Sequence, residues 1–411
     1  MSPVQDSRAT GDTVRSDARA WNPADFGPQT SFVHRTPQRT LHTTGVHRAV
    51  RVGPELHGLP GRAAQLLATA RRDDADASTP GTPTVIAGAL PFHVDHSSEL
   101  FVPRTARFSR STDVRATAPM PSPATAWRRR SVPEPSVYAQ EVRRVLDQLT
   151  PGQLDKVVLA RSLHLTAPTM IDIGGLLRRL AHRDPHARTF AVRLPGDSAD
   201  GHGRRMLVGA SPELLVSTDG EAVVSHPLAG SAARSADPAQ DRERADALRR
   251  STKDAHEHAI VVEAITDVLQ PYCRKLSVPR QPSLLRTASM WHLGTRISGE
   301  LRDSGTSALE LAVALHPTPA VCGWPTARAQ AVIDETEPFD RGFYSGAVGW
   351  CDTNGDGEWA VALRCAEIAG DAARLFAGAG IVPGSDPGAE LAETSAKLRT
   401  VLSALGIEEE T

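Results

Sequence analysis

The sequence has no uninterrupted apolar run near the ~20 residues that a membrane-spanning helix needs. Its first residues, MSPVQDSRATGDTVRSD, are polar and charged and lack the apolar segment of a signal peptide. The formal net charge is only −2 over 411 residues, which gives no reason to expect nucleic acid or a membrane surface as a partner. These absences predict a cytoplasmic protein.

Cysteine is scarce as well. The four cysteines lie far apart and form no C-x-x-C pair; they are Cys273, Cys322, Cys351 and Cys365. That spacing is not typical of a zinc site or a disulfide framework. We therefore expect four reduced thiols.

The chain is long enough for one large domain, and its apolar content of 40% is sufficient for a substantial core. Residues 1–30 are polar and aperiodic, so we expect a disordered N-terminal tail there. Residues 31–411 are predicted to form a single domain. Within it, residues 111–135 contain five prolines and predict a surface excursion.

Strand and helix patterns are mixed along this domain. Apolar runs and turn signals predict strands over 84–92 and 155–165 and around the Asp219-Gly220 hairpin turn. Helical periodicity predicts helices over 62–72, 136–149, 242–272, 308–315 and 390–405. Because strands and helices do not alternate regularly, we predict an α+β fold and not a doubly wound sheet.

One segment imitates a calcium site. DTNGDGE, residues 352–358, matches the first half of an EF-hand loop. The twelfth position should be a bidentate glutamate but is Leu363, and both flanks have strand patterns. We predict a β-hairpin turn instead.

Two of the predicted helices carry carboxylates on a face that continues as an apolar stripe. Asp254 and Glu257 are one turn apart on the first helix, and Glu390 and Glu393 repeat the pattern on the last. A carboxylate that enters a core is costly unless it is paired or bound to a metal.

Two interpretations of these carboxylates remain open from spacing alone. If the helices face each other, the like charges repel unless a cation lies among them, and an all-oxygen set favours Mg²⁺. Alternatively, each pair lies on a solvated helix face, with Glu393 and Lys397 forming an i,i+4 ion pair.

From about Ser31 to Gly406 the chain resembles the chorismate-utilising enzymes, and most closely the isochorismate synthases of the catechol-siderophore type. Nine segments in a single order carry the resemblance: DKVVLARS, GASPELL, PLAGSAAR, KDAHEH, WHLGT, LHPTPAVCGWP, EPFDRGFYSGAVGWCD, GEWAVALRCA and LFAGAGIVPGSDPGAELAETSAKL. The resemblance implies an α+β fold of two packed β-sheets with surrounding helices. It implies conversion of chorismate to isochorismate with Mg²⁺ as cofactor.

The resemblance also implies binding residues. Glu257 and Glu393 correspond to direct Mg²⁺ ligands, with Asp254 and Glu390 supporting the ion. Asp254 is shorter than the glutamate of other members, so its contact is expected to be more indirect. The expected substrate-binding residues are Gly230, Ser231, His292, Tyr344, Arg364, Lys397 and the backbone of Gly378, Ala379 and Gly380.

Lys156 resembles the family's general base and Glu213 its general acid. In the implied reaction, water attacks C2 of the ring while the C4 hydroxyl leaves, and the ring double bonds shift. Water should lose a proton to Lys156, and the departing hydroxyl should gain one from Glu213. An apolar setting would keep the acid protonated near neutral pH.

Several alternatives remain. Salicylate synthases share the metal site and the lysine, and anthranilate and aminodeoxychorismate synthases usually lack the lysine. HPTPAVCGWP is more similar to the isochorismate synthases, because the relatives that eliminate pyruvate or use ammonia tend to carry Thr-Ala-Ser-Gly in that loop. A menaquinone-pathway enzyme and a non-catalytic chorismate-binding homologue stay open. We expect a monomer whose product passes to downstream siderophore-pathway enzymes.

Overall fold

The computed structural model describes residues 21–22, 25–50, 56–76, 85–111, 127–197 and 204–407. Most of the predicted tail and of the proline-rich segment lies outside these residues. Trp21 is nevertheless buried, and its backbone N–H donates to Ser109 Oγ over 3.2 Å. Packed structure therefore begins before residue 31.

Seventeen strands form one continuous antiparallel network that divides into two sheets. The first sheet follows the order β12 (Cys273–Ser277), β15 (Ile297–Leu301), β10 (Ala222–His226), β9 (Leu214–Asp219), β18 (Gly357–Val361), β17 (Ala347–Asp352) and β3 (Val85–Leu90). β3 then pairs with β4 (Glu99–Arg110), the first strand of the second sheet.

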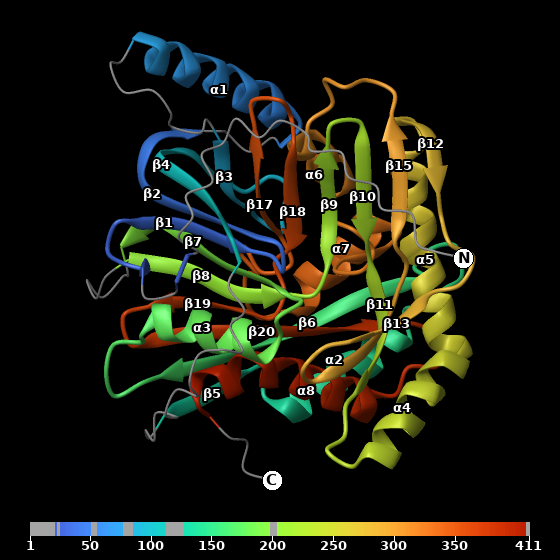
Figure 1. Ribbon diagram of the computed structural model, residues 1–411. Helices are drawn as coiled ribbons and strands as arrows, with labels where there is room; N and C mark the ends of the chain where they lie inside the picture. Colours follow the sequence, from blue (N-terminus) through green and yellow to red (C-terminus); the bar gives the residue numbers. More distant parts are fainter. Residues whose placement is uncertain are drawn as a thin grey trace, which may run out of the picture.

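The second sheet continues from β4 through β2 (Arg39–Val50), β1 (Thr30–Arg35), β7 (Arg188–Asp197), β8 (Arg204–Ser211), β19 (Cys365–Ala369), β20 (Ala372–Ile381) and β6 (Lys156–Thr166). On its other edge, β6 pairs with β5 (Arg128–Val132) and β16 (Gly323–Trp324). In Figure 1, β1, β7, β8, β19, β20 and β6 of the second sheet run roughly horizontally, whereas β9, β10, β17 and β18 of the first sheet run roughly vertically. A separate three-stranded sheet contains β11 (Leu228–Ala233), β14 (Met290–Gly294) and β13 (Ser283–Arg286).

Helices cover the outer faces of both sheets. The helices are α1 (Leu59–Asp76), α2 (Pro135–Leu146), α3 (Ile173–Arg183), α4 (Pro238–Arg250), α5 (Thr252–Leu269), α6 (Ala308–Leu315), α7 (Thr326–Thr336) and α8 (Pro387–Leu405), with a 3₁₀ turn η2 (Leu56–Gly58) before α1. One apolar core lies between the first sheet and α1, α5 and α6, a second lies between the second sheet and α3 and α8, and a third lies between the two sheets. The α+β class is confirmed, with the two sheets joined through β3 and β4.

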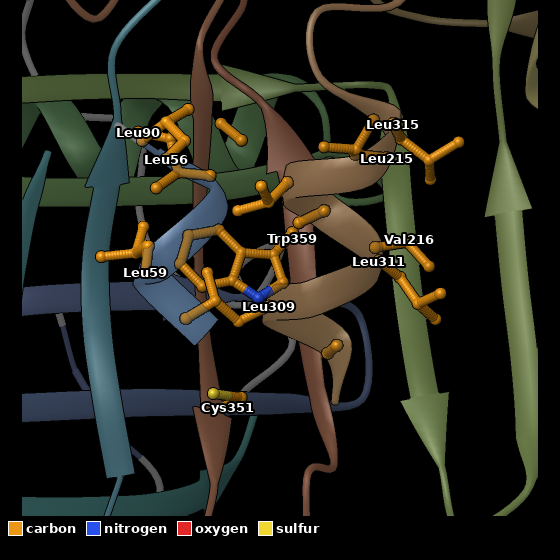
Figure 2. Close-up of a cluster of buried hydrophobic side chains, with 14 of the residues drawn as sticks. Leu56, Leu59, Leu90, Leu215, Val216, Leu309, Leu311, Leu315, Cys351 and Trp359 are labelled. Atoms are coloured by element: carbon orange, nitrogen blue, oxygen red, sulfur yellow. The ribbon is translucent and has the colours of Figure 1, made fainter. Parts of the chain in front are cut away.

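Figure 2 shows the first of these cores. Trp359 of β18 lies fully buried among the leucines of α6 and of the η2–α1 corner. Because the core fixes α6 and α5 against the first sheet, it also fixes the helix that carries Asp254 and Glu257.

Several local predictions are confirmed. The β9–β10 hairpin turns at Asp219-Gly220, and residues 352–358 form the β17–β18 hairpin. All four cysteines are buried and unpaired. Within the described segments, no helix is both long and apolar enough to span a membrane.

Two local predictions are wrong. Residues 242–272 form two helices, because Ser251 ends α4 and its side chain accepts a hydrogen bond from Asp254 N at the start of α5. Part of the proline-rich excursion is not a surface loop, since residues 128–132 form β5, which pairs with β6. The three arginines of β5 are exposed, so the pairing comes from their backbone groups.

Candidate active site

A cavity opens where the two sheets, the three-stranded sheet and helices α5 and α8 meet. Its walls include most of the residues that the sequence predicts for the site: Glu213, Gly230, Ser231, Glu257, His292, Tyr344, Arg364, Gly378, Gly380, Glu393 and Lys397. The space that they enclose, including its opening to solvent, is about 560 Å³. Residues as far apart in the sequence as Glu213 and Lys397 therefore converge on one place.

Strand β20 forms one wall through its two glycines. A side chain at Gly380 would place a Cβ only 2.2 Å from Glu257 Oε1, and one at Gly378 would lie 3.1 Å from the Tyr344 hydroxyl. Ala379, between them, is buried on the opposite face of the strand, as the alternation of a strand requires. The glycines thus leave room for α5 and for a ligand against the backbone.

The four predicted metal-binding carboxylates come from the N-terminal turns of α5 and α8. Glu257 and Glu393 line the cavity, whereas Glu390 is buried beside it. Asp254 packs against the Gly230 turn, where φ is +78°. Neither helix therefore turns its carboxylates to bulk solvent as a simple solvated face would.

Three lysines pair with these carboxylates. Lys156 Nζ lies 3.0 Å from Glu257 Oε1, as an ion pair without hydrogen-bond geometry. Lys253 Nζ is 2.7 Å from Glu390 Oε1. Lys397 Nζ is 2.6 Å from Glu393 Oε1, and it also donates to Gly378 O over 2.8 Å.

The pKa values of the neighbouring Glu390 and Glu393 are shifted in opposite directions. Burial, then the charge of Glu393, raises the pKa of Glu390. Burial also opposes ionisation of Glu393, but the Lys397 ammonium together with Ser231 and Lys253 outweighs it, and the pKa of Glu393 lies below its ordinary value. The lysines thus balance a set of carboxylates that would otherwise repel one another.

Glu213 is enclosed between β8 and β9. Burial raises the pKa of its carboxyl to about 7, although a hydrogen bond from the backbone of Leu228 and the charges of Lys156 and Arg364 oppose the shift. Its backbone is fixed through Ser211, whose Oγ accepts from Glu213 N over 3.2 Å. Glu213 can therefore carry a proton near neutral pH, as a general acid must.

Arg364 and His292 complete the polar lining. Arg364 lies between β18 and β19 with φ of +50°, a conformation that non-glycine residues rarely adopt and that is concentrated at functional sites. Burial, together with the charges of Arg364 and Lys397, holds the pKa of His292 well below its usual value. Within the described part of the chain, His292 Nε2 has no hydrogen-bond partner, so it is available to a ligand.

Of the predicted residues, Lys156, Asp254, Ala379 and Glu390 do not line the cavity directly. Lys156 is fully buried behind Gly380. A Cβ added at Gly380 would lie only 3.1 Å from Lys156 Cε. The sequence reasoning did not identify the rest of the wall: Val158, Pro212, Leu228, Ala229, Ala320, Val321, Ser345 and Leu363. Most of these are apolar, and their only sequence signal is that they adjoin the polar motif residues.

The carboxylates fit a Mg²⁺ ion by their chemistry. Mg²⁺ is usually held by one or two carboxylates together with waters and substrate oxygens, and Glu257 and Glu393 both face the cavity. Across the residues that the structure describes, no three histidine, cysteine or acidic side chains are grouped so as to hold a metal ion by themselves. Two carboxylates facing one cavity fit an ion that keeps waters or substrate oxygens in its shell.

Comparison with known proteins identifies the family of the chain. The family model described as "Chorismate binding enzyme" matches residues 88–406. The isochorismate synthase DhbC of Bacillus subtilis is 46% identical over 92% of this chain and 94% of its own length. The crystal structure of DhbC from Bacillus anthracis superposes with a TM-score of 0.86 at 43% identity, covering 94% of this chain and 98% of that one.

A more distant structure has the same fold. MenF, the menaquinone-specific isochorismate synthase of Escherichia coli, gives a TM-score of 0.73 at 25% identity over 92% of this chain and 88% of that one. Family match, sequence identity and fold agree over nearly the whole domain, and the chain belongs to the chorismate-binding enzymes.

Proposed function

We propose that the protein converts chorismate to isochorismate with the help of Mg²⁺. The observation that carries the proposal is a carboxyl in the cavity wall whose pKa burial raises to about 7, Glu213, together with a fully buried lysine, Lys156, directly behind Gly380 of the same wall. Arg364 and Lys397 add positive charge at the same cavity, which suits a dianionic substrate. The similarity to isochorismate synthases supports the same reaction.

The reaction needs one base and one acid and no electron transfer. Lys156, in its neutral amine form, takes a proton from water as the oxygen–C2 bond forms, the ring double bonds shift, and the C4–oxygen bond breaks. Glu213 gives its proton to the departing hydroxyl, which leaves as water. The Arg364 guanidinium presents a planar fork for a substrate carboxylate, and His292 Nε2 is available to orient the substrate.

Glu257 and Glu393 would hold the Mg²⁺, with Asp254 and Glu390 supporting it. When bound, the ion supplies positive charge to the ring carboxylate of chorismate. Lys156 Nζ lies 3.0 Å from the Glu257 carboxylate, and Lys397 Nζ lies 2.6 Å from that of Glu393. Each lysine is therefore beside a proposed Mg²⁺ ligand and close to the place where the substrate would lie.

We further propose that the product feeds synthesis of 2,3-dihydroxybenzoate for a catechol siderophore, through downstream enzymes of that pathway. The chain is more similar to DhbC of Bacillus anthracis than to the menaquinone-specific MenF of Escherichia coli, in both identity and TM-score. A Mycobacterium tuberculosis protein described as a putative isochorismate synthase MenF is 47% identical over 80% of this chain, so a menaquinone pathway is the competing assignment. Salicylate synthesis is the competing activity for this cavity, because it needs the same base and metal followed by loss of pyruvate.

The test incubates the purified protein with chorismate and Mg²⁺ and separates the products chromatographically. We expect isochorismate in a reversible mixture with chorismate, and only traces of pyruvate and salicylate near neutral pH. Stoichiometric pyruvate would assign a salicylate synthase instead. Binding of chorismate without turnover would assign a non-catalytic homologue.

The metal is tested on the same preparation. Excess chelator should abolish turnover and Mg²⁺ should restore it, and Glu257→Ala should lose both turnover and calorimetric Mg²⁺ binding in the presence of chorismate. Glu263→Ala is the matched control, because Glu263 is exposed on the same helix. Turnover that persists in excess chelator would contradict the Mg²⁺ proposal.

A further inference from the structure

Strand β6, which begins with Lys156, has an incomplete edge. On one side it pairs with β20 along its length. On the other side β16 pairs only as far as Val157 and β5 pairs only from Ser162, so no described strand pairs with residues 158–161 there. Val158 N still donates to Cys322 O over 2.8 Å, just beyond β16. A buried peptide group without a partner is costly, so Val158 O and Ala160 N need another source of hydrogen bonds.

A buried ion pair fills the gap. Arg341 Nη2 donates to Val158 O over 2.7 Å, and Glu337 Oε1 accepts from Ala160 N over 2.7 Å. The pair itself is closed by two hydrogen bonds, from Arg341 Nε at 2.8 Å and Nη2 at 2.5 Å to the two carboxylate oxygens. The side chains of Arg341 and Glu337 are only 1% and 3% exposed. A guanidinium and a carboxylate thus replace a neighbouring strand.

The same guanidinium contacts two other walls of the cavity. Arg341 Nη1 donates to Val321 O over 2.8 Å, and Val321 lines the cavity. The backbone of Arg341 accepts from Tyr344 N over 3.0 Å, and its guanidinium lies 5.9 Å from the Tyr344 ring. One side chain therefore spans the strand of Lys156, the 316–324 loop and the turn of Tyr344.

Energetics favours a positioning role over a purely stabilising one. A buried ion pair contributes little net stability, because desolvation offsets the attraction, but removal of one partner is costly. An apolar replacement of the ion pair could not hydrogen-bond the backbone of Val158 and Ala160 in β6 and that of Val321 at the same time. Val158 lies two residues from Lys156, on the same face of the strand, and it lines the cavity.

We propose that the Glu337–Arg341 pair is a positioning element for the reaction, which sets the place of Lys156 relative to the opposite walls of the cavity. The inference rests on the proposed function in that Lys156 is taken as the base. Arg341 and Glu337 do not line the cavity, so they act through β6 and not on the substrate.

The decisive variant is Arg341→Lys, which keeps a positive charge but cannot bond three partners in a fixed plane. We expect kcat to fall about 10- to 100-fold, as for misplacement of a catalytic group by about 1 Å. KM should change far less, since Arg364 and Lys397 belong to other elements, and calorimetry should still show one chorismate per chain. Arg188→Lys is the control: its 2.5 Å pair with Glu358 joins β7 and β18 away from the cavity.

A double-mutant cycle separates positioning of the base from a general effect. In a Lys156→Gln background, Arg341→Lys should lower the residual kcat less than about twofold, because the group that it positions is already gone. An equal loss in both backgrounds, an equal loss in Arg188→Lys, or wild-type kcat in Arg341→Lys would overturn the proposal. If Arg341→Lys does not fold, Glu337→Gln is read by the same criteria. Failure of the wild type to form isochorismate concerns the proposed function alone.

Discussion

Glu213 illustrates how a single residue is tuned by its place in the fold. The residue is 3% exposed, and burial is the dominant cause of the raised pKa of its carboxyl. Because the neutral form is favoured in the folded state, the native protein binds more protons than the unfolded chain between pH 4.5 and about 7. Stability from this group is therefore greatest at low pH and declines as pH rises through that window.

The raised pKa of Glu213 predicts an alkaline limb in the pH dependence. The kcat/KM for chorismate should fall as pH rises through about 7, because the free enzyme then loses its acid. Glu213→Gln should lower kcat by about 10²- to 10⁴-fold and lose this limb. It should also be more resistant to denaturant than the wild type at pH 8, because the amide has no charge to bury. A wild-type profile flat between pH 6 and 9 would exclude Glu213 as the acid.

The proposed role of Lys156 as the base predicts a loss of kcat when the residue is replaced. Lys156→Gln keeps a polar side chain of similar reach but cannot accept a proton, so kcat should fall about 10²- to 10⁴-fold with a much smaller change in KM. Lys275→Gln is the control, because Lys275 is 75% exposed and pairs with Glu300 at the surface. If Lys156→Gln kept more than about a tenth of the wild-type kcat, a change under ~1.4 kcal/mol, another base would be required.

At the scale of elements, the site depends on where helices begin. α5 starts at the Ser251 cap, which places Asp254 and Glu257 in its first two turns, and α8 starts at the Asp386 cap, which does the same for Glu390 and Glu393. A helix N-terminus carries a partial positive charge that stabilises nearby anions. The helix ends thus act against burial, which raises the pKa of Asp254 and of Glu390.

Ser251 gives a test of this arrangement. Ser251→Ala should lower the free energy of unfolding by about 1 kcal/mol and should also lower kcat, because the first turn of α5 would loosen around Asp254. Ser307→Ala removes the equivalent cap of α6, whose Oγ accepts from Glu310 N over 3.1 Å. That control should cost similar stability in a denaturant titration and leave kcat unchanged, since α6 contributes nothing to the cavity lining. Equal kcat losses in both variants would show that stability alone explains the effect.

The elements also show what the sequence could and could not predict. The α6 and β6 patterns were sufficient because strong periodicity or a continuous apolar run marks them. The α4–α5 break was missed because helical residues continue on both sides of Ser251, and the capping signal is a single side chain. The sequence does not predict the β5 pairing, because exposed arginines carry no strand pattern. It does not predict the role of the Glu337–Arg341 pair either, because the gap that the pair fills exists only once the strands have paired.

At the scale of the molecule, the cavity is assembled where the chain crosses between the sheets. Glu213 lies between β8 of the second sheet and β9 of the first, and Arg364 lies between β18 of the first and β19 of the second. The core between the sheets, which includes Phe190, Trp350 and Phe376, holds these crossings together. Glu213 and Arg364, the proposed acid and the proposed carboxylate-binding residue, are therefore in place only when both sheets are packed.

This placement predicts that ligand binding and global unfolding are coupled. Thermal unfolding followed by tryptophan fluorescence and by far-UV circular dichroism should give one coincident transition, because each sheet contributes to the same cores. Chorismate with Mg²⁺ at about 100 times its Kd should stabilise the protein by about 2.7 kcal/mol and shift both signals equally. Arg364→Ala, which lacks the guanidinium at the crossing, should unfold in one transition that the ligands do not shift. Two separate transitions, only one of them sensitive to ligand, would show instead that one sheet holds the site without the other.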